Sequence, residues 1–306
     1  MKILLLGTNG QVGWELQRSL APLGEIIGLD ADSKDFCGDF TNLQGLTETV
    51  RRIAPDIIVN AAAHTAVDKA ESEPELVRTI NALAPAALAQ EAKRCNAWLI
   101  HYSTDYVFDG HGDKPWLETD ATAPLNVYGA TKLEGEQLIQ QSACKHLIFR
   151  TSWVYGARGG NFAKTMLRLA QERDELSIIN DQIGAPTGAD LLADITAHAI
   201  RTALLSPELS GLYHLVAAGE TSWHGYASFV IDFAQNHGVS MWITPEDVHP
   251  VPTSAFPTAA RRPLNSRLST EKLQNTFALH VPHWQAGRCH PYAGGSAGEW
   301  EVGSGE

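Results

Sequence analysis

The sequence has few cysteines and comparatively few basic residues, and each shortage excludes a class of protein. Cys37, Cys95, Cys144 and Cys289 lie far apart and form no C-x-x-C pair, so we expect neither a disulfide framework nor a zinc knuckle. The chain has 23 Lys and Arg against 35 Asp and Glu, and its net charge is −12. It lacks the dense basic stripe that nucleic acid or an anionic membrane surface requires. We therefore expect neither nucleic acid nor a membrane among its partners.

Long hydrophobic runs are also missing. No stretch reaches the length of a transmembrane helix. The first residues lead directly into a strand-like segment, without the apolar region and cleavage site of a secretory signal. The sequence therefore predicts a cytoplasmic protein. Its 306 residues, 44% hydrophobic and 19% charged, are typical of a globular protein with a sizeable core.

The first half of the chain alternates short apolar runs with longer segments of helical spacing. The expected strands are Lys2–Leu6, Glu25–Asp30, Asp56–Asn60, Trp98–Ser103 and His146–Thr151. The expected helices between them are Val12–Leu20, Leu46–Ile53, Leu76–Arg94 and Val127–Gln141. This alternation predicts an α/β fold, a Rossmann-type doubly wound parallel sheet.

Beyond residue 155 the alternation loosens. We expect helices at Phe162–Arg173, Ala189–Leu204 and Tyr226–His237, and strands at Leu176–Ile179 and Tyr213–Val216. Five prolines between residues 245 and 263 predict an ordered but irregular loop layer, which we interpret as the outer wall of a substrate cleft. The expected organisation is a dinucleotide-binding core over residues 1–155, a mainly substrate-binding lobe over 156–286, and a disordered tail over 287–306.

A glycine-rich turn joins the first expected strand to the first expected helix. In Gly7-Thr-Asn-Gly10-Gln-Val-Gly13, the first glycine allows a tight turn and the second a close approach to a diphosphate. The third allows close contact of helix and sheet. The spacing is G-x-x-G-x-x-G, not the commoner G-x-G-x-x-G, and a purely structural turn is the alternative. The strand before it and the helix after it favour a dinucleotide site at the helix N-terminus.

Asp30 ends the second expected strand, where an acid accepts hydrogen bonds from the adenosine ribose and disfavours a 2′-phosphate. This position favours NADH. Lys34 is close enough to weaken the discrimination, so both NADH and NADPH remain candidates. The alternative is that Asp30 caps a turn.

Tyr128 and Lys132 are spaced i, i+4 on an expected helix, which places both side chains on one face. The spacing predicts that the Lys132 ammonium favours the phenolate of Tyr128 and holds the nicotinamide ribose, while Tyr128 protonates a carbonyl oxygen. Y-x-x-x-K alone is common by chance. Thr104 comes directly after the expected strand that precedes this helix, at its carboxyl end, where its hydroxyl is placed to hydrogen-bond the same oxygen. The three signals in this order predict a nicotinamide-dependent reductase.

These motifs resemble the extended short-chain dehydrogenases, and the wider sequence is similar to the dTDP-4-dehydrorhamnose reductase family. The matching stretches, between residue 1 and about residue 285, are GTNGQVGWEL, NAAAHTAVDKAE, HYSTDYVF, LNVYGATKLEGE, RTSWVYG, INDQIGAPTG and RRPLNSRLST. The resemblance implies NAD(P)H-dependent reduction of the C4 keto group of dTDP-4-dehydro-L-rhamnose to dTDP-L-rhamnose. That step feeds lipopolysaccharide O-antigen and other cell-surface polysaccharide.

The resemblance also implies roles for individual residues. Besides the glycine turn, Tyr128 and Lys132, the implied cofactor contacts are Gln11, Val12, Asp30, Asp39, Phe40, Ala63, His64, Thr65 and Tyr102. The implied substrate contacts are Thr104, Asp105, Trp153, Arg262 and Asn265. For His64 the alternative is a polar loop residue, and for Trp153 it is a plain core aromatic.

Members of this family are described as holding Mg²⁺ with acidic side chains at a dimer contact. Glu15 matches that set, Asp190 is a shorter acid at a corresponding place, and the expected C-terminal glutamate is missing. The sequence GRCHPYAGGSAGEWEVGSGE replaces the helix that would follow Gln285, so both Mg²⁺ and a homodimer stay open. A transition-metal site of His280, His283, Cys289 and His290 is disfavoured by Pro282 and by the composition of the tail.

Two other functions remain alternatives. A sugar-nucleotide epimerase or 4,6-dehydratase shares the fold and Y-x-x-x-K, but a dehydratase requires a further acid/base pair beside the threonine, which Asp105 alone does not supply. A non-catalytic nucleotide-binding regulatory subunit would be favoured by loss of Tyr128 or Lys132, and both are present.

Overall fold

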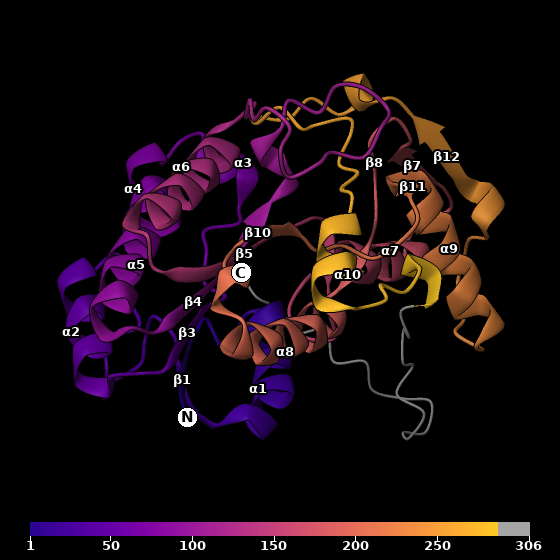
Figure 1. Ribbon diagram of the computed structural model, residues 1–306. Coiled ribbons are helices and arrows are strands. Elements are labelled where there is room, and N and C mark those ends of the chain that lie inside the picture. Colours follow the sequence, from indigo (N-terminus) through magenta and orange to yellow (C-terminus); the bar gives the residue numbers. More distant parts are fainter. Residues whose placement is uncertain (287–306) are drawn as a thin grey trace.

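The computed structural model describes residues 1–286 and is built around a six-stranded parallel sheet (Figure 1). Its strands, in spatial order, are β10 (Gly211–His214), β5 (Lys145–Thr151), β4 (Trp98–Thr104), β3 (Ile57–Asn60), β1 (Lys2–Leu6) and β2 (Glu25–Leu29). The chain runs from β1 outward to β2 and then crosses back to β3, so its winding reverses beside β1. This topology confirms the predicted doubly wound α/β fold and places a crevice at the carboxyl ends of β1 and β3.

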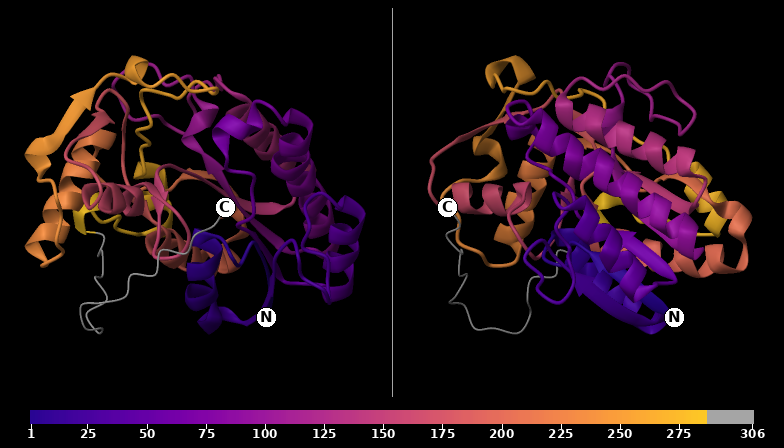
Figure 2. Two further views of the ribbon diagram at one scale, coloured as in Figure 1. Left: turned by 180° about the vertical axis from the view of Figure 1, so that it is seen from behind. Right: turned by 90° about the vertical axis from the view of Figure 1, so that its left-hand side faces the viewer.

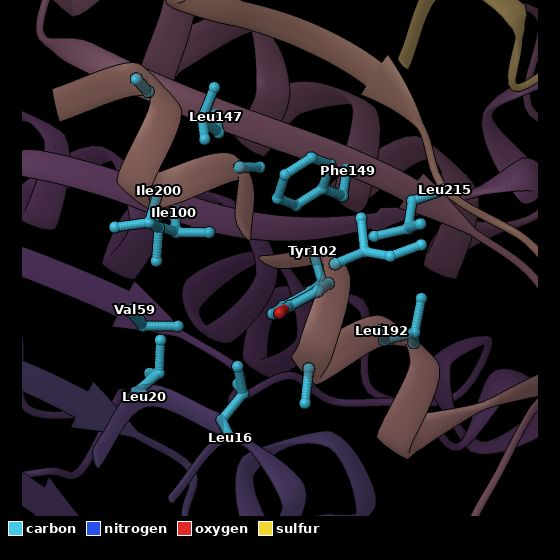
Figure 3. Close-up of a cluster of buried hydrophobic side chains, with 14 of the residues drawn as sticks. Leu16, Leu20, Val59, Ile100, Tyr102, Leu147, Phe149, Leu192, Ile200 and Leu215 are labelled. Carbon is cyan, nitrogen blue, oxygen red and sulfur yellow. The ribbon is translucent and has the colours of Figure 1, made fainter. Parts of the chain in front are cut away.

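Helices cover both faces of this sheet. One face carries α1 (Gln11–Leu20) and α8 (Ala189–Leu205), and the other carries α2 (Leu43–Ile53), α5 (Ala84–Cys95) and α6 (Val127–Ser142). Figure 3 shows the first of these cores, where Leu16 of α1 and Leu192 of α8 lie around Tyr102 of β4. Because both faces are buried, the strands are almost continuously apolar rather than alternating.

The expected single helix Leu76–Arg94 is instead three consecutive elements. They are α4 (Pro74–Arg78), a π-helical segment η2 (Thr79–Leu83) and α5. Pro85 has no N–H to donate to the carbonyl of Asn81, which removes one α-helical hydrogen bond at this point. A π-helical insertion often marks a functional site, and this one directs Asn81 towards the loop after β3.

A second, smaller core lies to one side of the sheet, with orange and gold ribbons in Figure 2. Its helices α7 (Phe162–Ala170) and α9 (Trp223–Asn236) pack with the paired strands β7 (Leu176–Ile179) and β12 (Val248–Val251). Two further short pairs are β6 (Val154–Tyr155) with β9 (Thr187–Gly188), and β8 (Ile183–Gly184) with β11 (Thr221–Ser222). The remaining elements are α3 (Val67–Ala70), α10 (Glu271–Phe277), η1 (Ala21–Leu23), η3 (Asp105–Val107), η4 (Pro207–Leu209), η5 (Pro245–Asp247), η6 (Thr253–Ala255) and η7 (Trp284–Ala286).

The chain differs from the sequence-based expectation in two places beyond residue 155. The proline-rich stretch is not wholly irregular, because it contains β12, which includes Pro250 and pairs in parallel with β7. A proline fits there because a two-stranded sheet leaves one side of each strand unpaired. The chain also returns to the central sheet through α8 and β10, so residues after 155 complete the dinucleotide-binding core.

Two further sequence-based expectations concern the C-terminal tail and membrane-spanning helices. The tail 287–306, expected to be disordered, lies outside the described residues. Within residues 1–286, no helix has the length and apolar character needed to cross a membrane.

Candidate active site

Backbone contacts leave no room for a larger residue at two of the three glycines of the turn. Gly7 has φ of +85°, and a Cβ there would lie 2.7 Å from the amide nitrogen of Ala62. A Cβ on Gly13 would lie 1.9 Å from the carbonyl oxygen of Gly7. Gly10, by contrast, meets only that same carbonyl, at 3.4 Å, and caps α1 without any side-chain hydrogen bond. The first N–H groups of α1, including those of Gln11 and Val12, are thus placed to bind a diphosphate, and the residues present fit a dinucleotide.

Asp30 ties this turn to the end of β2. Its carboxylate accepts hydrogen bonds from the hydroxyl of Thr8 and, at 3.1 Å, from the backbone N–H of Asn9. These contacts match the alternative in which Asp30 stabilises a turn. Lys34, four positions after Asp30, is exposed. The contact of Asp30 with a ribose stays a prediction.

Two residues of the β6–α7 connection reach the same turn, and sequence reasoning missed both. The exposed Arg158 donates from Nε to the carbonyl of Asn9 at 3.1 Å, and its guanidinium lies 4.3 Å from the ring centre of Trp14. Asn161 donates from Nδ2 to Oε1 of Gln11 at 3.2 Å. They are about 150 positions from the turn in sequence, so no local spacing could have signalled a cation beside the phosphate position.

The loop after β3, with Ala63, His64 and Thr65, is held at the same edge of the sheet by Asn81. The side chain of Asn81 accepts from the N–H of His64 at 2.9 Å and donates to its carbonyl at 3.0 Å. The ring of His64 is mostly buried, with Nε2 3.9 Å from Glu73. The start of this loop lies beside the glycine turn, since a Cβ on Gly7 would meet the amide nitrogen of Ala62, and the contacts of the loop with a cofactor stay predictions.

Three other predicted cofactor residues have contacts of their own. Asp39 accepts from the N–H and the hydroxyl of Thr41 at 2.8 and 2.7 Å, and Phe40 is buried in the core beneath α2. The hydroxyl of Tyr102 hydrogen-bonds Thr196 at 2.7 Å on the α8 face, so this side chain is part of the core in Figure 3. Their contacts with a cofactor stay predictions.

Thr104 and Tyr128 meet at the carboxyl end of β4. Helix α6 begins beside this strand end because Asn126 caps it, accepting from the N–H of Gly129 at 2.8 Å. Gly129 also allows the helix to approach closely, since a Cβ there would lie 2.2 Å from the carbonyl of Tyr106. The Thr104 hydroxyl lies close enough to the hydroxyl of Tyr128 to lower its pKa. The arrangement joins the predicted hydroxyl and the predicted proton donor in one place.

Burial is the main influence on the hydroxyl of Tyr128. It raises the pKa of this group to about 12, and the nearby Asp105 adds to this rise, while the nearby hydroxyl of Thr104 opposes it. The Nζ of Lys132 donates to the carbonyl of Tyr102 at 2.6 Å and lies 3.3 Å from His101. That Lys132 favours the phenolate of Tyr128 stays a prediction. Tyr128 carries its proton at neutral pH, which is the state a proton donor needs.

Asp105 is buried next to Thr104. Burial raises the pKa of its carboxyl to about 7, while the nearby hydroxyls of Ser266 and Thr104 oppose this rise. Its Oδ1 accepts from the Thr104 hydroxyl at 3.1 Å, and within residues 1–286 its buried Oδ2 has no hydrogen-bond partner. An unpartnered buried oxygen beside the predicted reaction centre fits the predicted contact with a sugar hydroxyl.

Trp153, at the start of the second lobe, adopts φ of +49°, which is rare for a bulky residue and frequent at functional sites. Its ring is half-buried and stacks on Trp223 with centroids 3.6 Å apart and planes 12° apart. Trp223 is itself held by Gln182, to which its Nε1 donates at 3.1 Å. Sequence reasoning missed Trp223. Because Trp223 covers one face of the Trp153 ring, the predicted contact of Trp153 with the sugar would use the rest of that ring.

The other two predicted substrate residues are already engaged. Arg262 donates from Nη2 to Asp68 at 2.6 Å, and its side chain is partly exposed. Asn265 is buried, with its amide donating to the carbonyl of Lys114 at 2.9 Å and accepting from the N–H of Arg267 at 3.2 Å. The amide of Asn265 is thus used to order its own loop. Contacts of both residues with a nucleotide stay predictions.

The acidic residues predicted to bind Mg²⁺ do not form a site within one chain. Over the part of the chain that the structure describes, no three His, Cys, Asp or Glu side chains are grouped to hold a metal. Glu15 lies 3.6 Å from the Nε of Arg18, and Asp190 is exposed in the first turn of α8. Of the disfavoured transition-metal set, Cys289 and His290 lie outside the described residues.

Comparison with known proteins agrees with this geometry. Residues 1–290 match the family model described as RmlD substrate binding domain. The dTDP-4-dehydrorhamnose reductases of Shigella flexneri and Escherichia coli K12 are each 64% identical to the chain, covering 94% of it and 95% of their own length. The solved dTDP-4-dehydrorhamnose reductase of Bacillus anthracis, in complex with NADP, is 36% identical with a TM-score of 0.82, covering 93% of this chain and 95% of its own. The chain belongs to the dTDP-4-dehydrorhamnose reductase family.

Proposed function

We propose that the protein is an NAD(P)H-dependent oxidoreductase that reduces the C4 keto group of dTDP-4-dehydro-L-rhamnose to dTDP-L-rhamnose. The observation that carries this proposal is the placement of the Tyr128 hydroxyl next to Thr104 at the carboxyl end of β4, on the sheet edge where the glycine turn also lies. The same chain is 64% identical to dTDP-4-dehydrorhamnose reductases over 94% of its length. This identity favours the reductase over an epimerase, a dehydratase or a non-catalytic subunit.

The residues of the chain have distinct parts in this reaction. When bound, the reduced nicotinamide supplies the hydride. The turn between Gly7 and Gly13 and the N-terminus of α1 bind the diphosphate, which fixes the position of the cofactor at the sheet edge. Thr104 hydrogen-bonds the C4 oxygen, and Tyr128 transfers its phenolic proton to that oxygen as the C4 carbon is reduced. Lys132, anchored to the carbonyl of Tyr102, orients the cofactor side of the site.

Residues of both the central core and the second lobe form the sugar side of the site in this proposal. Asp105 binds a sugar hydroxyl through its unpartnered Oδ2, and Trp153, supported by Trp223, packs on the hexose. Arg262 lies on the nucleotide side. Both NADPH and NADH are proposed cofactors, because Asp30 is engaged by the turn and Arg158 adds a positive charge there. A homodimer, Mg²⁺ and the cytoplasmic location remain predictions from the sequence.

The proposal is tested by incubating the purified protein with dTDP-4-dehydro-L-rhamnose and either NADPH or NADH. We expect the reduced cofactor to be oxidised in step with formation of dTDP-L-rhamnose. No oxidation should occur with the cofactor alone or with the same sugar nucleotide carrying a hydroxyl at C4. Failure with this ketone, together with turnover of another sugar nucleotide, would refute the substrate assignment.

A further inference from the structure

Behind Lys132 lies a buried row of polar side chains to which no role has been given. Asn60 ends β3, and His101 lies on the adjacent strand β4, on the face that α6 covers. The exposed fractions are 1% for Asn60, 1% for His101 and 2% for Lys132. Buried polar groups at this depth require defined partners, so each hydrogen in the row has a definite place.

The orientation of Asn60 is fixed by the backbone. Its Oδ1 accepts from the N–H of Ala62 at 3.0 Å, so the other end of the amide, Nδ2, faces Nδ1 of His101 at 3.0 Å. An amide nitrogen only donates, so Nδ1 of His101 must be the acceptor and carries no proton. A neutral His101 therefore has its proton on Nε2.

That proton is directed at Lys132. Nε2 of His101 lies 3.3 Å from Nζ of Lys132, which also donates to the carbonyl of Tyr102 at 2.6 Å. An N–H group facing an ammonium is repulsive, whereas a neutral amine accepts the hydrogen bond through its lone pair. Burial holds the pKa of His101 well below its usual range, so the ring remains neutral in either protonation state of Lys132.

We propose that His101, oriented by Asn60, is a positioning residue that donates a hydrogen bond to the neutral amine of Lys132 and thereby sets the protonation equilibrium of this lysine. The tautomer of His101 follows from the structure alone. Its effect on turnover rests on the proposed function, in which Lys132 belongs to the reductase site.

The other groups around Lys132 agree with an amine that exchanges its proton near neutral pH. Burial lowers its pKa to about 8, and Glu136 on α6 opposes this shift. Glu136 is already bound by Arg150 at 2.9 and 2.7 Å, which limits its hold on the lysine. Tyr128 on the same helix and Tyr102 on β4 are both neutral phenols, because burial raises the pKa of each.

The first test is the tautomer of His101 in the wild-type protein, read from the ¹⁵N chemical shifts of its ring nitrogens. We expect a neutral ring with the proton on Nε2, and a proton on Nδ1 would overturn the proposal. In Asn60→Asp, a carboxylate replaces the amide donor, so the proton should move to Nδ1. These measurements do not depend on catalysis, so they remain decisive if the proposed substrate is wrong.

The second test compares two substitutions of His101. Phe removes both ring nitrogens, whereas Gln keeps one acceptor and one donor. We expect His101→Phe to raise the apparent pKa on the alkaline side of the kcat profile by roughly one unit, the value of one hydrogen bond. His101→Gln should restore most of the wild-type profile. An unchanged profile in His101→Phe, or an equal shift in both variants, would contradict the role of the donor.

Discussion

The buried ion pair between Glu136 and Arg150 fixes the helix that carries Tyr128 and Lys132 to the sheet. Arg150 on β5 donates from Nε and Nη2 to the two carboxylate oxygens at 2.9 and 2.7 Å. The two side chains are only 5% and 2% exposed. Glu136→Gln preserves the shape but leaves the Arg150 guanidinium buried without its carboxylate. Breaking one side of a buried pair costs about 3–5 kcal/mol of folding free energy.

The same helix offers a matched control. Glu134, two positions earlier, binds Arg78 through two nitrogens at 2.9 and 2.6 Å, but these side chains are 31% and 45% exposed. Exposed pairs contribute about 0.2–1 kcal/mol, because water screens both charges whether or not they touch. Glu134→Gln should therefore lower stability by less than about 1 kcal/mol.

Urea unfolding at neutral pH, followed by circular dichroism, compares the two variants. The midpoint of Glu136→Gln should fall several times further than that of Glu134→Gln, with the slope m unchanged in both. Equal shifts would show that burial does not decide the strength of these pairs, and would refute the reasoning.

Two further predictions follow from the site. Gly13→Ala should lower the melting temperature and weaken NADPH binding, because its Cβ would meet the carbonyl oxygen of Gly7 at 1.9 Å. Gly160→Ala is the control, since a Cβ there meets nothing within 4 Å. Equal melting temperatures in the two variants would contradict this description of the turn. Asp105→Asn should stabilise the fold increasingly as pH rises from about 4 to about 7, and by a constant amount above that. Burial raises the carboxyl pKa from 3.8 to about 7, so the wild-type fold is favoured by protonation and loses this contribution as pH rises; a pH-independent difference in melting temperature would refute it.

Much of the fold was predictable because it depends on local patterns. Strand β1 and strand β7 have the predicted bounds, since an apolar run between turn residues permits little else. The meeting of Thr104 and Tyr128 was predictable as well, because parallel strands end at one edge and the following helix starts there.

The features that sequence reasoning missed depend on long-range contacts. The direction of the Lys132 side chain is set by the carbonyl of Tyr102 and by His101, which no i, i+4 spacing reveals. The contact of Arg158 with the glycine turn joins segments 149 positions apart. Trp153 is held at a positive φ beside Trp223, and that conformation has no signature in the residues around it.

Tyr128→Phe tests most directly whether Tyr128 donates the proton. Single-turnover oxidation of NADPH with dTDP-4-dehydro-L-rhamnose should slow by about 10²–10⁴-fold, while the Kd for NADPH is unchanged. Tyr213→Phe removes a hydroxyl that bonds the carbonyl of Leu209 on the edge of the sheet, and should turn over at the wild-type rate. A wild-type rate in Tyr128→Phe would contradict the account.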